Sequence, residues 1–455
     1  MTTPSIASEV AASGARLEIS PATAFIDDEL SIRILGLKAR ETVTIRASTE
    51  DDDKRVWSSH ATFAANSSGS VDVRSQEPMS GTYRGISPMG LFWSMNLEGQ
   101  EKTGRATFVK KNATTNKVTL EVRSAERVIA ATYCERSYLA PGTQARDLQL
   151  PGEPTTNSIY TVGRLFLPPG AKAGDRLPVV IVLSGSGGGF DLDKAALIAR
   201  HGFAAFALAY FGTPPLPTWL HHIPLEYFEG AFGWLCAQPE VDPKRVGILA
   251  VSRGAELALL LGTRFTQIRT VVAYAPSSVV WAAGGRDKQS GELPPSWTYG
   301  GKAIPFVPLP LRQFIFRSAI PVALLKRPVM FRDLFRAGLR NSKAVAAAAI
   351  PVEQIHGPIM LISSGDDHLW PAEEMSEAIV ARLKKHGFAH RVEHLHYPDA
   401  GHMLRYPFLP TTARDSRNPH LRNARYSFGG TAPADAEAQA DSWRHSIAFL
   451  KSSLT

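Results

Sequence analysis

Residues 246–261, VGILAVSRGAELALLL, are the stretch that decides the fold of this chain. The apolar, β-branched first part predicts a buried strand, and the alanine- and leucine-rich part after Gly254 predicts a helix. Ser252 falls at the reversal between them, where a nucleophile elbow of the form G-x-S-x-G exposes a serine hydroxyl. Ala250 replaces the first glycine of that form, and alanine is small enough for the same approach of strand and helix. The alternative is that Ser252 only caps the helix with its side chain.

The composition predicts a globular protein of two domains. The chain has 455 residues, which is too long for one ordinary core, and 44% of them are apolar and 20% charged. A net charge of +8 allows weak attraction to anionic partners, but the basic residues are scattered and no nucleic-acid-binding motif is recognisable. Two distant cysteines, no signal-like N-terminus and no apolar run of about 18 residues predict a cytoplasmic protein without stable membrane insertion.

Residues 1–145 read as an all-β domain. Short segments in which apolar and polar residues alternate follow one another between polar turns, which is the period of a half-buried antiparallel sheet. Seven or eight such strands predict an immunoglobulin-like β-sandwich. The segments are LEI, ELSIRILGL, ETVTIRAS, WSSHATFAA, GSVDVRS, RATFVKK, KVTLEVRS and VIAATYCERSY. Residues 140–157, rich in Pro, Gly and Thr, are predicted to be a linker.

Residues 146–455 change to an alternation of strands and helices. The strands are predicted at YTVGRLFLP, LPVVIVLSG, FAAFALAYF, VGILAVS, TVVAYAPS, PIMLISSG and RVEHLHYP, with helical segments between most of them. Continuous apolar strands of this kind are typical of a parallel sheet with helices on both faces, so the fold class is α/β and doubly wound. In such sheets the chemistry lies at the carboxyl ends of the strands.

The loop SGSGGG, residues 184–189, follows one of these buried strands. Its glycines allow several backbone N–H groups to point at one spot, and we predict that the N–H groups of Ser186 and Arg253 hold an oxyanion. A phosphate cradle and a permissive turn are the alternatives. The loop matches neither common phosphate-binding pattern.

Two later strand ends carry an acid and a base. GDDHLWP places Asp366 and Asp367 after one strand, and DAGHML places His402 after the next. Ser252, Asp367 and His402 thus follow the order Ser, Asp, His that is expected of α/β-hydrolases. We predict that His402 takes the Ser252 proton, that Asp367 orients the imidazole, and that Asp366 caps a helix. Surface or packing roles are expected for His201, His368, His386, His390, His394 and His396.

The chain resembles the family of acyl-CoA thioesterases and bile acid-CoA:amino acid N-acyltransferases. The motifs that carry the resemblance run through nearly the whole chain: GISPMGLFWSM, LFLPPG, LSGSGGG, GFAAFALAYFG, LEYFEGAFGWL, AVSRGAELALLL, GDDHLW, YPDAGHML and ADSWRHSIAFLKSSL. The resemblance implies an immunoglobulin-like domain packed on an α/β-hydrolase domain that cleaves the thioester of fatty acyl-CoA. It places nucleophile, acid and base on Ser252, Asp367 and His402, since Asp367 directly precedes the His-x-Trp of the motif. No cofactor and no metal are implied.

The chain departs from the family pattern at two positions, and three alternative functions remain. The amino-acid acyltransferases that this chain resembles usually carry cysteine as nucleophile, so Ser252 favours water as the acyl acceptor. Arg253 stands where lysine is common, which leaves a backbone donor unchanged. Transfer to an amine such as glycine or taurine, hydrolysis of oxygen esters as in dienelactone-type hydrolases, and a non-enzymatic binding module remain alternatives.

Residues 302–349 form an insert that is longer and more apolar than the resemblance leads us to expect. PLPLRQFIF and IPVALLKRPVMFRDLF interleave apolar residues with arginine. We predict a cap over the active site, where an acyl chain lies beside basic residues suited to the phosphates of CoA. The alternatives are a packing subdomain and a peripheral helix that touches a membrane.

Overall fold

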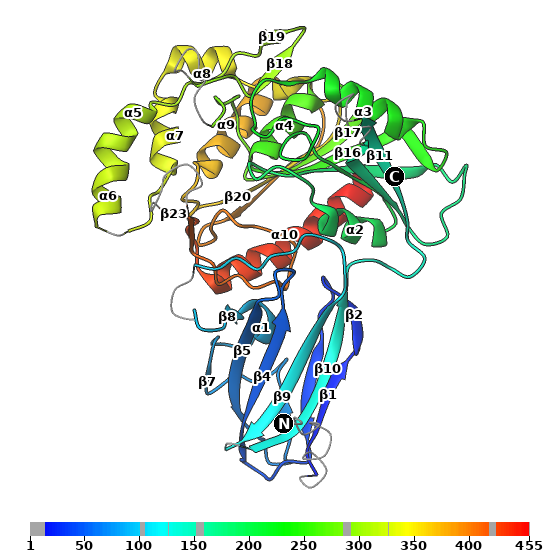
Figure 1. The fold of residues 1–455 in the computed structure, drawn as a ribbon, viewed down its shortest axis with the longest axis vertical. Coiled ribbons are helices and arrows are strands. Elements are labelled where there is room, and N and C mark those ends of the chain that lie inside the picture. The colour runs from blue at the N-terminus through cyan, green and yellow to red at the C-terminus, as the bar shows by residue number, and fades with distance from the viewer. Residues whose placement is uncertain are drawn as a thin grey trace. The chain divides into compact units, whose positions relative to one another are not determined.

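The computed structural model describes residues 14–100, 105–125, 127–151, 159–284, 293–325, 327–417 and 425–454. The chain divides into two compact units, coloured by residue number in Figure 1. The first unit consists of Met1–Leu139, Arg405–Arg414 and Thr431–Ala440. The second unit consists of Ala140–Leu404, Asp415–Gly430 and Asp441–Thr455. Two late segments therefore belong to the first unit although they follow most of the second in sequence.

The first unit contains two β-sheets. The smaller sheet joins β1 (Arg16–Ser20), β3 (Ser31–Leu35) and β6 (Val71–Asp72) in antiparallel order. The larger one runs β2-β10-β9-β4-β5-β7, with β8 (Asn96–Leu97) beside β5. Its strands are β2 (Thr23–Phe25), β4 (Thr42–Glu50), β5 (Val56–Ala64), β7 (Ser80–Gly81), β9 (Asn116–Ser124) and β10 (Arg127–Ser137). Burial alternates along β4 and β5, as the sequence period predicts.

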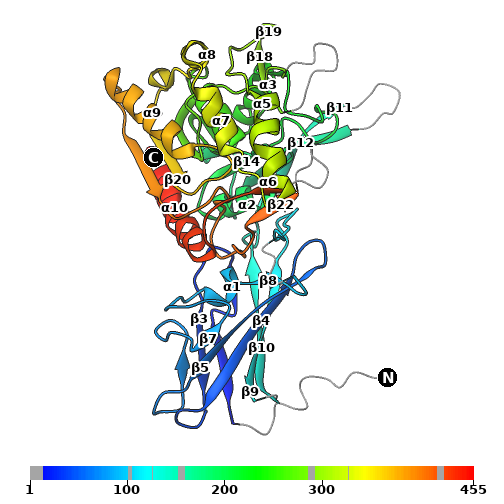
Figure 2. The same ribbon diagram turned by 90° about the vertical axis from the view of Figure 1, so that its left-hand side faces the viewer.

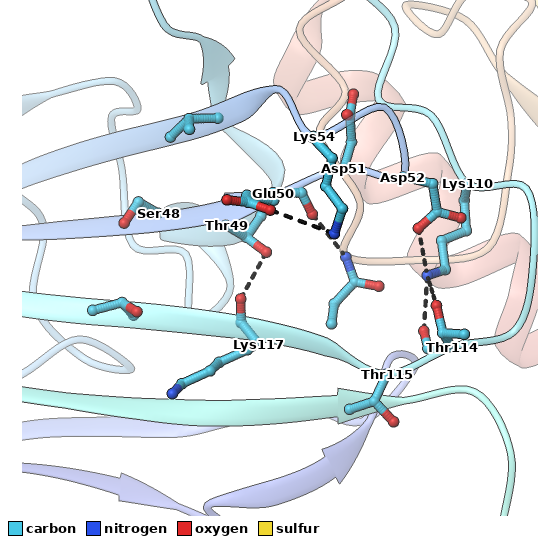
Figure 3. Close-up of a pocket in the computed structure, with 13 residues that line it drawn as sticks. Ser48, Thr49, Glu50, Asp51, Asp52, Lys54, Lys110, Thr114, Thr115 and Lys117 are labelled. Carbon is cyan, nitrogen blue, oxygen red and sulfur yellow. Dashed lines mark hydrogen bonds and ion pairs between the residues drawn. The ribbon is translucent and has the colours of Figure 1, made fainter.

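The predicted strand at residues 105–111, RATFVKK, does not form, so that prediction is wrong. The backbone here bonds to the turn after β4: Asp52 N–H donates to the Val109 carbonyl (3.0 Å), and Lys111 N–H donates to Asp52 Oδ2 (2.7 Å). Lys110 Nζ lies 3.1 Å from Asp52 Oδ1 and donates to the Thr114 carbonyl, as Figure 3 shows. The acidic turn thus takes the backbone groups that a β-ladder would need.

The second unit is built on an eight-stranded sheet of order β11-β12-β14-β13-β16-β17-β20-β21. The six strands from β14 to β21 are parallel, and β11 and β12 add an antiparallel edge. The strands are β11 (Gln144–Pro151), β12 (Ile159–Leu167), β13 (Leu177–Leu183), β14 (Ala204–Leu208), β16 (Val241–Val251), β17 (Ile268–Tyr274), β20 (Ile359–Ser364) and β21 (Val392–Tyr397). We predicted a linker at residues 140–157, but Gln144–Pro151 form strand β11, so the prediction is wrong for these residues. Residues 152–158 lie outside the described residues.

Helices cover both faces of this sheet (Figure 1). On one face lie α2 (Leu192–Arg200) and the part of α10 (Ala432–Ser453) that begins at Asp441; His201 and Trp443 form an edge-to-face ring contact there. On the other face lie α3 (Glu226–Cys236), α4 (Arg253–Gly262) and α9 (Ala372–Lys385). Their apolar sides and the strands share one continuous core. The α/β architecture predicted from the sequence is confirmed in this unit, and it brings the ends of β16, β20 and β21 to one edge.

The insert at residues 302–349 is mostly helical. After β19 (Lys302–Ala303) come α5 (Leu311–Phe314), a π-helical turn (Ile315–Ala319), α6 (Ile320–Leu324), α7 (Arg332–Leu339) and α8 (Ser342–Ala348). Figures 1 and 2 both show α5, α6 and α7 side by side at the margin of the second unit. A small cluster formed by Phe314, Ala319, Val329 and Leu334 holds them together. Among the described helices of the whole chain, none is long and apolar enough to cross a membrane.

Candidate active site

Ser252 occupies a tight turn between β16 and α4. Its φ and ψ are 57° and −121°, a left-handed conformation that is strained for any residue other than glycine. The Ser252 N–H donates to the Tyr274 carbonyl on β17 (2.8 Å), while its own carbonyl accepts from Ala255 and Glu256 N–H and so begins α4. The Ser252 side chain makes no capping hydrogen bond. The strained turn therefore presents the hydroxyl away from the helix, as a nucleophile elbow requires.

The small residues around Ser252 explain how the turn is packed. A Cβ on Gly254 would lie 2.2 Å from the Ser184 carbonyl oxygen and 3.0 Å from that of Leu183, so only glycine fits there. Ala250 is fully buried on β16, where the usual pattern has glycine, and its methyl group is accommodated in the core. Close packing of α4 on the end of β13 thus depends on Gly254.

His402 and Asp367 meet Ser252 at the same edge of the sheet. His402 Nε2 lies 3.1 Å from Ser252 Oγ, and His402 Nδ1 lies 2.7 Å from Asp367 Oδ2. The other carboxylate oxygen, Asp367 Oδ1, accepts from Leu369 N–H (2.8 Å) and Trp370 N–H (3.1 Å), which fixes the orientation of the carboxylate. All three side chains are buried. The three residues predicted from the sequence are therefore brought together in a hydrogen-bonded series.

Asp366 has a different set of partners. Its Oδ2 accepts from Gly430 N–H (2.8 Å), and its Oδ1 lies 2.9 Å from His368 Nε2. Its side chain is 44% exposed, whereas that of Asp367 is 2% exposed. The predicted helix-capping role of Asp366 is wrong, because α9 begins after Pro371 without a side-chain cap.

Three other histidines also have polar partners, which sequence reasoning missed. His368 Nδ1 lies 2.8 Å from Ser427 Oγ, beside its contact with Asp366. His394 Nε2 and His396 Nδ1 both lie within hydrogen-bond distance of Ser363 Oγ (2.7 and 3.3 Å). Burial lowers the pKa of His394 below its usual value. The contacts of His394 and His396 with Ser363 join the neighbouring strands β20 and β21, and His368 reaches Ser427 from a loop, so no spacing in the sequence indicated them.

The loop 184–189 lies directly against the elbow. A Cβ on Gly185 would lie 3.3 Å from Ser252 Cβ. The loop is shaped by its own bonds: Gly188 N–H donates to the Gly185 carbonyl, Gly189 N–H donates to the Phe211 carbonyl, and Tyr210 Oη donates to the Ser184 carbonyl (2.6 Å). Within the described residues, the N–H groups of Ser186 and Arg253 donate to no protein atom. Both predicted oxyanion donors are therefore available.

A buried polar network lies under the elbow, and it too was missed. Arg253 Nη1 donates to Glu256 Oε2 (2.6 Å), and Arg253 Nη2 donates to the Trp281 carbonyl (3.1 Å) and to Ser296 Oγ. Trp297 Nε1 donates to Glu256 Oε1 (2.8 Å). Burial raises the pKa of Glu256 to about 7. The Arg253 side chain is thus bonded within the interior, which leaves its backbone N–H as the group assigned to the oxyanion.

Aromatic side chains connect His402 to the insert. The Trp370 ring lies edge-on to the His402 ring at 6.3 Å between centroids, and Phe335 of α7 lies 5.7 Å from Trp370. Trp281 packs edge-on against Phe335 at 4.9 Å. These rings form one apolar wall beside the imidazole. Among the described residues there is no group of three or more His, Cys, Asp or Glu side chains that could hold a metal ion.

Two protein-family models and several relatives match this chain. The model for the C-terminal part of bile acid-CoA:amino acid N-acyltransferases and acyl-CoA thioester hydrolases matches residues 223–455, and the model for their N-terminal region matches residues 27–149. The chain is 30% identical to bile acid-CoA:amino acid N-acyltransferase of Mus musculus, over 97% of this chain and 98% of that protein. It is also 30% identical to mitochondrial acyl-coenzyme A thioesterase 2 of Mus musculus, over 94% and 87% of the two chains.

A similarity to solved structures is weaker. The hyperthermophilic esterase of Pyrobaculum calidifontis matches with a TM-score of 0.40 and 16% identity, over 68% of this chain and 85% of the esterase. The sequence relatives instead extend over nearly the whole chain, and the two family models together match residues 27–149 and 223–455. This chain therefore belongs to the family of bile acid-CoA:amino acid N-acyltransferases and acyl-CoA thioester hydrolases.

Proposed function

We propose that this chain is an acyl-CoA thioester hydrolase that releases a free fatty acid and CoA through an acyl-enzyme on Ser252. The observation that carries the proposal is the hydrogen-bonded series from Ser252 through His402 to Asp367, in a chain of this family. A serine hydroxyl is a weak nucleophile unless a base removes its proton in the transition state. His402 Nε2, 3.1 Å from the Ser252 oxygen, is placed to do so.

In the first step Ser252 Oγ attacks the thioester carbonyl carbon while its proton passes to His402 Nε2. The N–H groups of Arg253 and Ser186 hold the oxyanion that forms, and Asp367 stabilises the imidazolium. The carbon–sulfur bond then breaks. CoA leaves either as a thiol that takes the proton from His402, or as a thiolate while His402 gives that proton to solvent, so that the imidazole is neutral again before the second step. A thiolate needs little protonation to leave, so we expect the second step to limit the rate.

In the second step a water molecule gives its proton to His402 and attacks the ester carbon of the acyl-enzyme. The oxyanion forms again in the same place, the bond to Ser252 Oγ breaks, and the serine regains its proton from the imidazolium. The fatty acid is released and the enzyme returns to its starting state. Serine at position 252 supports water as the acceptor, as the resemblance to the family implies.

Two further features belong to the proposal. The insert at residues 302–349 would act as a cap, since Phe335 on α7 contacts Trp370 beside His402. Residues 1–145 would form the supporting immunoglobulin-like domain, which is consistent with the two sheets of the first unit. The cytoplasmic location stays a prediction, and two relatives are peroxisomal and mitochondrial by name.

The similarity to N-acyltransferases supports a second candidate, in which an amine takes the acyl group from Ser252. Release of free CoA should be measured with short, medium, long and branched acyl-CoAs, with and without glycine or taurine, and the acyl product identified. Free acid in both conditions supports hydrolysis, whereas an N-acyl amino acid as the main product supports the transferase. Activity on nitrophenyl esters without activity on any acyl-CoA would reject both, and failure of a fluorophosphonate probe to label Ser252 would reject the nucleophile.

A further inference from the structure

The helical part of the insert has an apolar face that no described residue covers. Residues 311–324, in which α5, the π-helical turn and α6 are continuous, are called the insert helix here. One side of it packs inward through Phe314 and Ala319. On the outer side Phe316, Ile320 and Leu324 are 67%, 43% and 78% exposed, and Leu325 follows at 67%. Apolar side chains of this size are normally buried, so an uncovered group of them marks an interaction surface.

The spacing of these exposed side chains places them on one face of the helix. Phe316, Ile320 and Leu324 are four residues apart, and side chains at that spacing lie above one another along a helix. The insert helix therefore has two apolar sides, one used by the protein and one facing outward.

The charged residues along the insert helix and in the segments on either side of it, from position 302 to position 332, are all basic. From position 302 to position 332 the sequence has six basic residues and no aspartate or glutamate. Arg312, Arg317 and Arg327 are exposed, and none of the three forms an ion pair with an acidic side chain in the described parts of the chain. A second copy of the same face would be repelled by this charge. An anionic surface would be attracted by it.

We propose that the insert helix docks the protein on the surface of a lipid bilayer that contains anionic phospholipid. Apolar side chains on one face, with arginines beside them, are the pattern of helices that lie in the plane of the interface. At about 1.5 Å per residue the helix is about 21 Å long, shorter than the roughly 30 Å hydrocarbon core, so it lies on the bilayer and does not span it. The docking does not depend on the proposed reaction.

The insert helix, which carries the outward face, is connected to the candidate site by ring contacts. Phe314, on the inner side of the insert helix, lies 5.6 Å from Phe331 between ring centroids. Phe331 directly precedes α7, whose Phe335 contacts Trp370 beside His402. A bilayer that binds the outer face would thus hold the helix that forms part of the wall next to the imidazole.

The test is binding of the full-length protein to vesicles, measured by sedimentation without any substrate. Vesicles of phosphatidylcholine alone are compared with vesicles in which roughly one third of the lipid is phosphatidylglycerol. We expect the partition constant to be at least about tenfold higher on the anionic vesicles and to fall as salt is added.

Variants identify the surface. Phe316→Ser with Leu324→Ser should lower partition to anionic vesicles at least about tenfold, and Arg317→Glu should lower it about fivefold. Met79→Ser is the matched control, because Met79 is also 67% exposed but lies in the first unit; it should leave binding unchanged. Ser252→Ala should bind as the natural sequence does, which separates docking from catalysis.

Three outcomes would overturn the proposal. Equal binding to neutral and anionic vesicles would remove the role of charge. Binding that survives Phe316→Ser with Leu324→Ser would place the surface elsewhere. Self-association that this double variant abolishes, without vesicle binding, would assign the face to a second copy of the chain.

Discussion

His402 Nε2 lies 3.1 Å from Ser252 Oγ, although 150 positions separate the two residues along the chain. The contact exists because β16 and β21 are parallel strands of one sheet, so that the loops after them open at the same edge. Asp367, from the loop after β20, completes the series on the far side of the imidazole. Ser252 and Asp367, at the two ends of this series, can each be tested by a substitution.

Ser252→Ala should lower kcat for acyl-CoA hydrolysis by at least about 10⁴-fold, because the acyl-enzyme can no longer form. Hydrolysis of a medium-chain acyl-CoA is the measurement. Thermal unfolding should be nearly unchanged, since the hydroxyl makes no capping hydrogen bond. Ser186→Ala is the control: it keeps the backbone N–H assigned to the oxyanion, so its activity should stay close to that of the natural sequence. Substantial turnover in Ser252→Ala would remove Ser252 from the mechanism.

Asp367→Asn and Asp366→Asn form a matched pair of neighbouring substitutions. Asp367 contacts His402 Nδ1 at 2.7 Å, and an amide there can present its N–H₂ group to that nitrogen and impose the wrong tautomer. We expect kcat to fall by about 10³- to 10⁴-fold. Asp366 contacts Gly430 and His368 instead, so its variant should lose less than about tenfold. If Asp366→Asn were the more damaged of the two, the acid would have to be reassigned.

The sequence predicted the three site residues because each lies in the loop that follows a predicted strand. Parallel strand ends must share an edge, so position in the sequence was enough to bring Ser252, Asp367 and His402 together. The network around Arg253 and Glu256 was not predictable in the same way. Residues three apart on a helix usually form a surface pair, and the partners Trp281 and Ser296 come from a segment without strand or helix periodicity.

Two predictions about local structure failed for physical reasons. Residues 105–111 alternate like a strand, but the carboxylate and backbone of the turn at Asp52 bind their backbone, and the sequence does not show that distant partner. Residues 144–151 lie within a stretch of turn-forming composition, yet they pair with β12 as the edge strand of the large sheet. An edge strand has only one neighbour, so its sequence carries a weaker pattern than that of a central strand.

Gly254→Ala should lower kcat more strongly than it lowers the stability of the fold. The new Cβ would lie 2.2 Å from the Ser184 carbonyl oxygen, so α4 and the loop 184–189 must separate and the two oxyanion donors with them. Losing one such donor usually lowers kcat by about 10²- to 10³-fold, and we expect a loss of at least that size. Gly187→Ala, in the same loop, places its Cβ where no atom lies within 4 Å and serves as the control. Equal kcat values for the two variants would show that the loop position does not matter.

Glu256→Gln tests the buried network through the pH dependence of stability. Burial raises the pKa of Glu256 to about 7 in the folded protein, against an ordinary value of 4.5, so the folded state holds a proton that the unfolded state has lost. Because the folded state binds this proton more tightly, the proton stabilises the folded protein. This contribution to the unfolding free energy is fully present below pH 4.5 and is lost as the pH rises from 4.5 through 7. Glutamine has no proton to lose and removes this dependence.

We therefore expect the unfolding free energy of the natural sequence, relative to Glu256→Gln, to fall by on the order of 1 kcal/mol per pH unit between about pH 5 and pH 7. Urea unfolding at several pH values in this range measures it. Glu353→Gln is the control. Hydrogen bonds from Arg382 lower the pKa of Glu353 in the folded protein, and its ordinary value of 4.5, which applies to the unfolded chain, already lies below this interval. The difference in unfolding free energy between Glu353→Gln and the natural sequence should be independent of pH. If the difference in unfolding free energy between the natural sequence and Glu256→Gln were also independent of pH, Glu256 would already be ionised in the folded protein, held in that form by Arg253.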